Sequence, residues 1–144
     1  MLQFNKKENN QEIDLIKVVS LLIHAAKIDE KYTDEERKLI KEFILNFSQL
    51  NKKNVAEKDV KEIINKAEDI EKSSNQILEF TKEIKKIDLK LKKIVLKTLW
   101  QIILSDNKSG IYENNLMRRI CGLLYVPDKL SGEIKSNILK GKNI

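Results

Sequence analysis

Apolar residues recur every three to four positions along almost the whole chain, which is the spacing of α-helices that bury one face. The clearest stripe runs through Leu91, Ile94, Thr98 and Ile102. Only one proline and four glycines interrupt the 144 residues, and no run of alternating apolar and polar residues lies between turn residues. A β-sandwich or barrel is therefore excluded. The pattern predicts an all-α fold with seven helices, near residues 12–28, 34–50, 56–70, 76–84, 89–104, 111–125 and 129–139.

Length and cysteine content indicate the domain number and the compartment. A chain of 144 residues is typical of one domain, so we expect one helical domain over residues 1–144, with residues 1–10 forming a polar, flexible N-terminus. The single cysteine, Cys121, excludes a disulfide scaffold and fits a reducing compartment. The longest nearly apolar stretch, Val18 to Ile23, is far shorter than the roughly 20 residues that cross a bilayer. We expect a cytoplasmic protein without membrane insertion.

The net charge of +6 raises the question of a nucleic-acid partner. Three of the 28 basic residues are arginines, whereas arginine is the usual reader of phosphates and bases. The densest lysine run lies within residues 82–97, and no aromatic residue interrupts it for base stacking. We expect most of these lysines to form a solvated surface. A candidate face for an acidic protein or a nucleic acid consists of Lys86, Lys90, Lys93 and Lys97.

An acidic motif occurs twice in the chain. Asp29 follows the first apolar helix, and Glu36 lies seven residues later in the first turn of the next helix. Asp106 follows the fifth predicted helix, and Glu113 again lies seven residues later in the first turn of the sixth. The sequence therefore contains an internal repeat of helix, aspartate, short loop and helix.

Two interpretations of these carboxylates remain open. In the first, Glu36 and Glu113 cap their helices, because a glutamate at the third helical position accepts from the backbone N–H of the cap residue, here Thr33 or Gly110. In the second, aspartate and glutamate of each loop face each other around a hard cation such as Ca²⁺, Mg²⁺ or Mn²⁺, which prefer oxygen ligands. Two such loops side by side would form a metal site from Asp29, Glu36, Asp106 and Glu113.

Both acidic segments resemble a known family. The first segment reads HAAKIDEKYTDEERKLI over residues 24–40, and the second reads LWQIILSDNKSGIYENNLMRRICGLLYV over residues 99–126. They are similar to the first and second acidic motifs of the TerB-like tellurite-resistance family, and the likeness extends from about Ile13 to Leu139. In the second motif the matching residues are Leu99, Trp100, Asp106, Tyr112, Glu113, Arg118, Arg119 and Ile120.

The resemblance implies a compact seven-helix bundle in which the two acidic motifs are pseudo-symmetric. It also implies a cytoplasmic protein of the tellurite or stress response, with a divalent-cation site at the same four carboxylates. The second motif departs from the family pattern, because Asn107, Gly110 and Asn114 stand where the family favours Gly, Asp and Glu. A similar domain is fused to J-domain co-chaperones, but that role is not expected here because these residues contain no J-domain.

Motifs for catalysis are absent from the sequence. It has no glycine-rich phosphate loop, no His-Glu-x-x-His, no Cys-x-x-Cys and no nucleophile elbow. One histidine and one cysteine leave no good candidate for a nucleophile with its base, so we expect no enzyme activity. A cation-binding module, a protein-interaction scaffold and a nucleic-acid-binding face remain open. We favour a combination of the first two, in which a bound ion orders loops that present a partner surface.

Overall fold

The computed structural model describes residues 15–28, 32–50, 55–73, 78–86, 88–106 and 110–142. A first helix spans residues 15–26. It is followed by α2 (Asp34–Leu50), α3 (Glu57–Ser73), α4 (Leu78–Ile84), α5 (Leu89–Ile103), the 3-10 helix η1 (Leu104–Asp106), α6 (Ile111–Leu123) and α7 (Asp128–Lys142). These ranges contain no β-strand, so the predicted all-α fold of seven helices is confirmed. The predicted flexible N-terminus, residues 1–10, lies outside them.

The helix over residues 15–26 lies at the centre of the core. Val18, Val19, Leu21, Leu22 and Ile23 have no exposed surface. A helix that is apolar on nearly every side must be covered on nearly every side, and its buried residues show that its neighbours cover it. Each fully buried side chain of this kind contributes roughly 1.5–3 kcal/mol to the stability of the fold.

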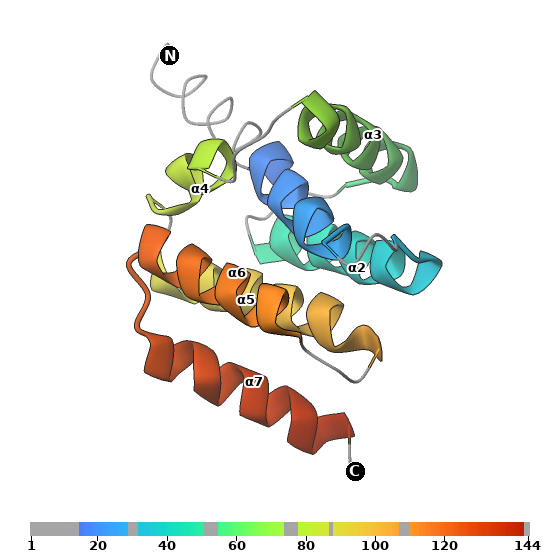
Figure 1. Cartoon of the computed structure of the whole chain (residues 1–144). Helices are drawn as coiled ribbons and strands as arrows, with labels where there is room; N and C mark the ends of the chain where they lie inside the picture. Colours follow the sequence, from blue (N-terminus) through green and yellow to red (C-terminus); the bar gives the residue numbers. More distant parts are fainter. Residues whose placement is uncertain are drawn as a thin grey trace.

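Helix α5 is flanked by α2 on one side and by α7 on the other. Figure 1 shows α7 along one side of the molecule and α3 on the opposite side. Most of the predicted apolar stripe of α5 is buried in this arrangement, including Val95, Leu99, Ile102 and Ile103. The lysines Lys90, Lys93 and Lys97 of α5 remain exposed, as expected for residues that lie off the stripe.

The side chain of the single tryptophan connects α5 with α7. Trp100 is 5% exposed, and its Nε1 donates a hydrogen bond to Ser131 Oγ on α7 over 2.9 Å. Lys135 Nζ, also on α7, lies 4.8 Å from the centre of the Trp100 ring. The hydrogen bond satisfies an indole N–H that burial would otherwise leave without a partner.

The connection between α6 and α7 is a tight corner of the Schellman type. The Val126 N–H donates to the Cys121 carbonyl over 2.9 Å, and the Tyr125 N–H donates to the Gly122 carbonyl over 3.3 Å. The residue after such a helix end has a positive φ and is usually glycine, whereas here Tyr125 occupies it with a φ of 56°. A side chain in this conformation costs about 1–2 kcal/mol, so the corner is strained.

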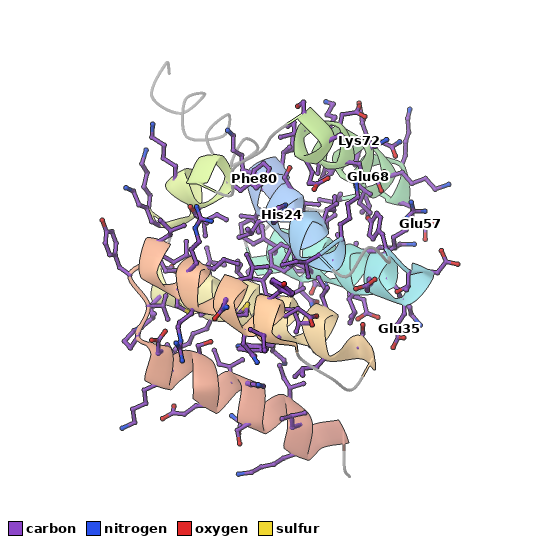
Figure 2. All side chains as sticks on the ribbon, in the orientation of Figure 1. His24, Glu35, Glu57, Glu68, Lys72 and Phe80 are labelled. Carbon is purple, nitrogen blue, oxygen red and sulfur yellow. The ribbon has the colours of Figure 1, made fainter. Side chains whose placement is uncertain are left out.

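An ionic seam holds α3 against its neighbours. Glutamates of α3 contact basic residues on the helix over residues 15–26, on the turn after that helix and on α2. Figure 2 shows His24, Glu57 and Glu68 along this boundary. The seam consists of four contacts, His24–Glu71, Lys27–Glu71, Arg37–Glu68 and Lys41–Glu57, with N–O distances of 3.5, 3.0, 3.5 and 3.4 Å.

Candidate functional site

Glu36 is placed by the capping box at the start of α2. Its Oε1 accepts hydrogen bonds from the Thr33 N–H over 2.8 Å and from the Thr33 hydroxyl over 3.0 Å. In return the Glu36 N–H donates to Thr33 Oγ1 over 3.1 Å. Glu36 is only 4% exposed, so these bonds compensate a carboxylate that has lost most of its water. The predicted capping role of Glu36 is confirmed.

Glu113 has the matching role at the start of α6. Its Oε1 accepts from the Gly110 N–H over 2.8 Å. Gly110 has no side chain to return a hydrogen bond, so only the glutamate half of the capping box is present. Glu113 is half-buried, and within the described residues its Oε2 makes no hydrogen bond or ion pair. The predicted capping role of Glu113 is therefore confirmed as well.

The predicted four-carboxylate metal site is described only in part. Asp29 lies outside the described residues, and of Asp106 the structure gives the backbone, at the end of η1, but not the side chain. No group of three or more His, Cys, Asp or Glu side chains able to hold a metal ion occurs among the residues that are described. The site from Asp29, Glu36, Asp106 and Glu113 therefore stays a prediction.

Three of the four lysines in the predicted partner face lie together on α5. Lys90, Lys93 and Lys97 are three and four residues apart and therefore share one face of the helix, and all three are exposed. Lys86 is exposed in the turn after α4. Lys93 and Lys97 also line a groove, which gives the lysine face a shape that the sequence did not reveal.

This groove runs across α5 between α2 and α7. It consists of two hollows of about 440 Å³ and about 650 Å³. The two hollows have Leu39, Ile94, Lys97 and Gln101 in common, so they join over the surface of α5. The first extends along α2, and the second extends toward α7. Together they form one open channel bounded by three helices.

The floor of the groove is largely apolar. Leu39 on α2, Ile94 on α5, and Ile134 and Ile138 on α7 are all half-buried. Leu50, at the end of α2, is 44% exposed and lines the first hollow. These side chains thus complete the core on one side and leave apolar surface open to a partner on the other.

Charged residues of opposite sign line the groove. Glu35 and Glu42 lie on α2, whereas Lys93 and Lys97 lie on α5, and all four are exposed. Figure 2 shows Glu35 at the first turn of α2. None of the four takes part in an ion pair with another described residue.

The hydroxyl groups in the groove are engaged within their own helices. Thr98 Oγ1 donates to the Ile94 carbonyl over 3.0 Å, and Ser105 Oγ donates to the Ile102 carbonyl over 2.8 Å. Among the described lining residues there is no histidine or cysteine. Among these described residues there is therefore no hydroxyl or thiol nucleophile beside a histidine base.

The lone histidine and the lone cysteine lie elsewhere. His24 contacts Glu71, and its ring centroid is 6.4 Å from that of Phe80 on α4. Cys121 is buried on α6, and burial raises the pKa of its thiol, so it has little of the thiolate character that a reactive cysteine needs. Cys121 is thus a buried packing residue, and His24 lies at the boundary with α3, so neither residue lines the groove.

Comparison with known proteins identifies the family. The family model described as tellurite resistance protein TerB matches residues 15–136. The chain belongs to the TerB family. Neither curated proteins nor solved structures gave a significant match. The TerB match extends from the first helix into α7, so most of the groove across α5 lies within the matched residues, whereas Asn137, Ile138 and Gly141 of its α7 side lie just beyond them.

Within the described ranges, no helix combines the length and the apolar character that crossing a bilayer requires. The apolar helix over residues 15–26 is instead covered by its neighbours.

Proposed function

We propose that this TerB domain is a non-catalytic cytoplasmic module of the tellurite or stress response that acts by binding another protein. The groove across α5 carries the proposal, because it combines an apolar floor with charges that have no ionic partner among the described residues. Its occupant is an amphipathic helix of the partner. A helix binds in such a groove through apolar residues spaced three, four and seven positions apart.

The dimensions of the groove suit a short helix. Lys93 on α5 and Ser105 on η1 both line it, and twelve residues of α-helix span about 18 Å. A partner helix laid along this length would contribute roughly three turns. Its apolar stripe would cover Leu39, Ile94 and Ile138, and an acidic edge would face Lys93 and Lys97.

The test uses two synthetic helical peptides that share one apolar stripe. The first has acidic residues beside the stripe, and the second has lysines in the same places. Titration followed by amide chemical shifts should show the acidic peptide binding several-fold more tightly and shifting residues of α2, α5 and α7. Equal binding of both peptides, or shifts confined to other helices, would contradict the proposal.

Two neighbouring residues on α7 provide a matched pair of variants. Ile138 lines the groove, whereas Leu139 is 37% exposed and does not line it in the described structure. Ile138→Gln should weaken binding of the acidic peptide about tenfold, which corresponds to the loss of one buried apolar contact. Leu139→Gln should leave the affinity unchanged. If both variants bind as the original chain does, the groove is not the site.

The cation site is a second proposal, supported by the Oε2 of Glu113, which makes no hydrogen bond or ion pair with a described residue. Millimolar Ca²⁺, Mg²⁺ or Mn²⁺ should shift the amide signals around residues 29–36 and 106–113. Asp29→Ala and Asp106→Ala should each remove the response. If those signals do not move with any of the three ions, or move equally in the two variants, the cation proposal is wrong, and the peptide test of the groove is unaffected.

A further inference from the structure

The lysine run before and within α5 meets the corner between α6 and α7. Lys85 Nζ lies 5.9 Å from the centre of the Tyr125 ring, and Lys92 Nζ donates to the Leu124 carbonyl over 2.9 Å. Figure 1 shows the end of α4 beside the end of α6. The sequence has no aromatic residue within this run of lysines, but the fold supplies one from far along the chain. We refer to Lys85, Leu89, Lys92 and Tyr125 as the basic corner.

Two large side chains of the basic corner are open to solvent. Tyr125 is 77% exposed and Leu89 is 51% exposed. Leu89 lies three residues before Lys92, so it projects from the same face of α5 that reaches Leu124. The fold therefore places an aliphatic and an aromatic side chain at one corner, among lysines.

The conformation of Tyr125 indicates that its side chain has a use outside the folded chain. Its φ of 56° is the left-handed conformation that glycine adopts without strain. A strained residue is usually compensated by burial or by function. With 77% of its surface exposed, Tyr125 gains little from burial.

Charge around the basic corner is strongly positive. The segment from Lys82 to Lys93 contains six lysines against Glu83 and Asp88. Asp88 is occupied as the cap of α5, where its Oδ1 accepts from the Leu91 N–H over 2.9 Å. Asp128, in the first turn of α7 just after the corner, is a further exposed carboxylate among the described side chains.

We propose that the basic corner adsorbs to the surface of an anionic phospholipid bilayer. Lysines attract anionic headgroups, tyrosine favours the headgroup level, and an exposed leucine gains free energy when it enters the acyl boundary. A single-stranded nucleic acid explains these residues less well, because it offers nothing to Leu89 and needs a row of aromatic residues for stacking. The contact is peripheral and involves no spanning segment.

Co-sedimentation of the full chain with vesicles tests this proposal. Vesicles of equimolar phosphatidylcholine and phosphatidylglycerol should bind the protein, and vesicles of phosphatidylcholine alone should not. Lys85→Gln should lower the partition coefficient about fivefold, since each lysine near an anionic surface contributes about that factor. Tighter binding to a single-stranded oligonucleotide than to the anionic vesicles would overturn the proposal.

Tyr125→Gly separates binding from folding. Glycine removes the aromatic ring and also relieves the strained φ, so this variant keeps the fold while losing several-fold in vesicle binding. Tyr112 is the matched control, because it is 81% exposed in the first turn of α6, beside Glu113 rather than among the lysines. Tyr112→Ser should bind vesicles as the original chain does. Equal losses for Tyr112→Ser and Tyr125→Gly would overturn the proposal.

Discussion

At the scale of single residues, the caps of the two acidic motifs differ in the threonine hydroxyl group. Thr33 and Glu36 share three hydrogen bonds at the start of α2, whereas Gly110 only donates to Glu113 at the start of α6. The repeat visible in the sequence is therefore a repeat of helix starts. Its first copy is complete, and its second lacks the side-chain half.

The difference between the two caps can be measured. Thr33→Ala should lower the free energy of unfolding by about 1 kcal/mol, because an N-cap hydroxyl is lost. Gly110→Ser should raise it by a few tenths of a kcal/mol, provided that the Glu113 carboxylate, 3.1 Å from a β-carbon added at Gly110, moves slightly. Urea unfolding followed by circular dichroism gives both values. An unchanged midpoint for Thr33→Ala would contradict this account of α2.

Tyr32 makes the stability of the fold sensitive to alkaline pH. Burial raises the pKa of its phenol above the usual value near 10, and the negative charge of Glu68 adds to this effect. Its hydroxyl oxygen is buried without a hydrogen-bond partner among the described residues. The ring packs against Arg37, whose guanidinium carbon lies 4.6 Å from the ring centre.

The sign of the pH effect follows from this raised pKa. Above about pH 10 the unfolded chain loses the Tyr32 proton while the folded chain keeps it, so the free energy of unfolding falls as the pH rises. Tyr32→Phe should remove this part of the fall and cost little at neutral pH. Urea unfolding of both proteins between pH 8 and pH 11 makes the comparison, in which the lysines act as a common background. Parallel curves would show that Tyr32 does not contribute.

At the scale of the elements, α3 depends on charge more than the other helices do. Two of its residues, Val60 and Ala67, are buried among apolar neighbours, and all four contacts of the ionic seam end on its glutamates. The Glu71 side chain is 12% exposed, whereas that of Glu57 is 86% exposed. Solvent screens the ion pair of Glu57 more strongly than those of Glu71, so the contacts of Glu71 contribute most of the ionic stabilisation of α3.

Hydrogen exchange can test this dependence. Glu71→Gln should speed amide exchange along α3 and lower its opening free energy by about 1 kcal/mol, while α5 remains protected. Glu57→Gln serves as the control and should change nothing measurable. Raising the salt concentration should act on α3 in the same direction as Glu71→Gln. Exchange that accelerates equally in α3 and α5 would instead indicate global destabilisation.

The helices themselves were predictable, because each carries its own periodicity. The stripe on α5 and the apolar first helix identify most of the core, and Thr33 and Glu36 predict the start of α2. Two local details were not predictable. The sequence continues the sixth helix to Tyr125, whereas α6 ends at Leu123, because the corner relies on a tyrosine where glycine is usual. The 3-10 turn η1 has no distinct residue pattern.

At the scale of the whole molecule, both proposed binding surfaces arise from residues that are distant in sequence. The groove is lined by Leu39, Ile94 and Ile138, which come from three helices. In the sequence, each of these residues resembles an ordinary core position. The basic corner needs Tyr125 beside Lys85. Periodicity assigns residues to faces but does not tell which faces become neighbours, so the lysines were predictable and their surroundings were not.

The hydrogen bond between Trp100 and Ser131 makes the fluorescence of the indole a reporter of the contact between α5 and α7. This indole is the only one in the chain and bridges α5 and α7, two of the walls of the groove. A ligand that separates these two helices breaks the hydrogen bond to Ser131 and exposes the indole to water. The fluorescence emission of the indole then shifts to longer wavelength. Ser131→Ala should produce a similar red shift without ligand. Occupancy of the groove can thus be followed by intrinsic fluorescence, with no label attached.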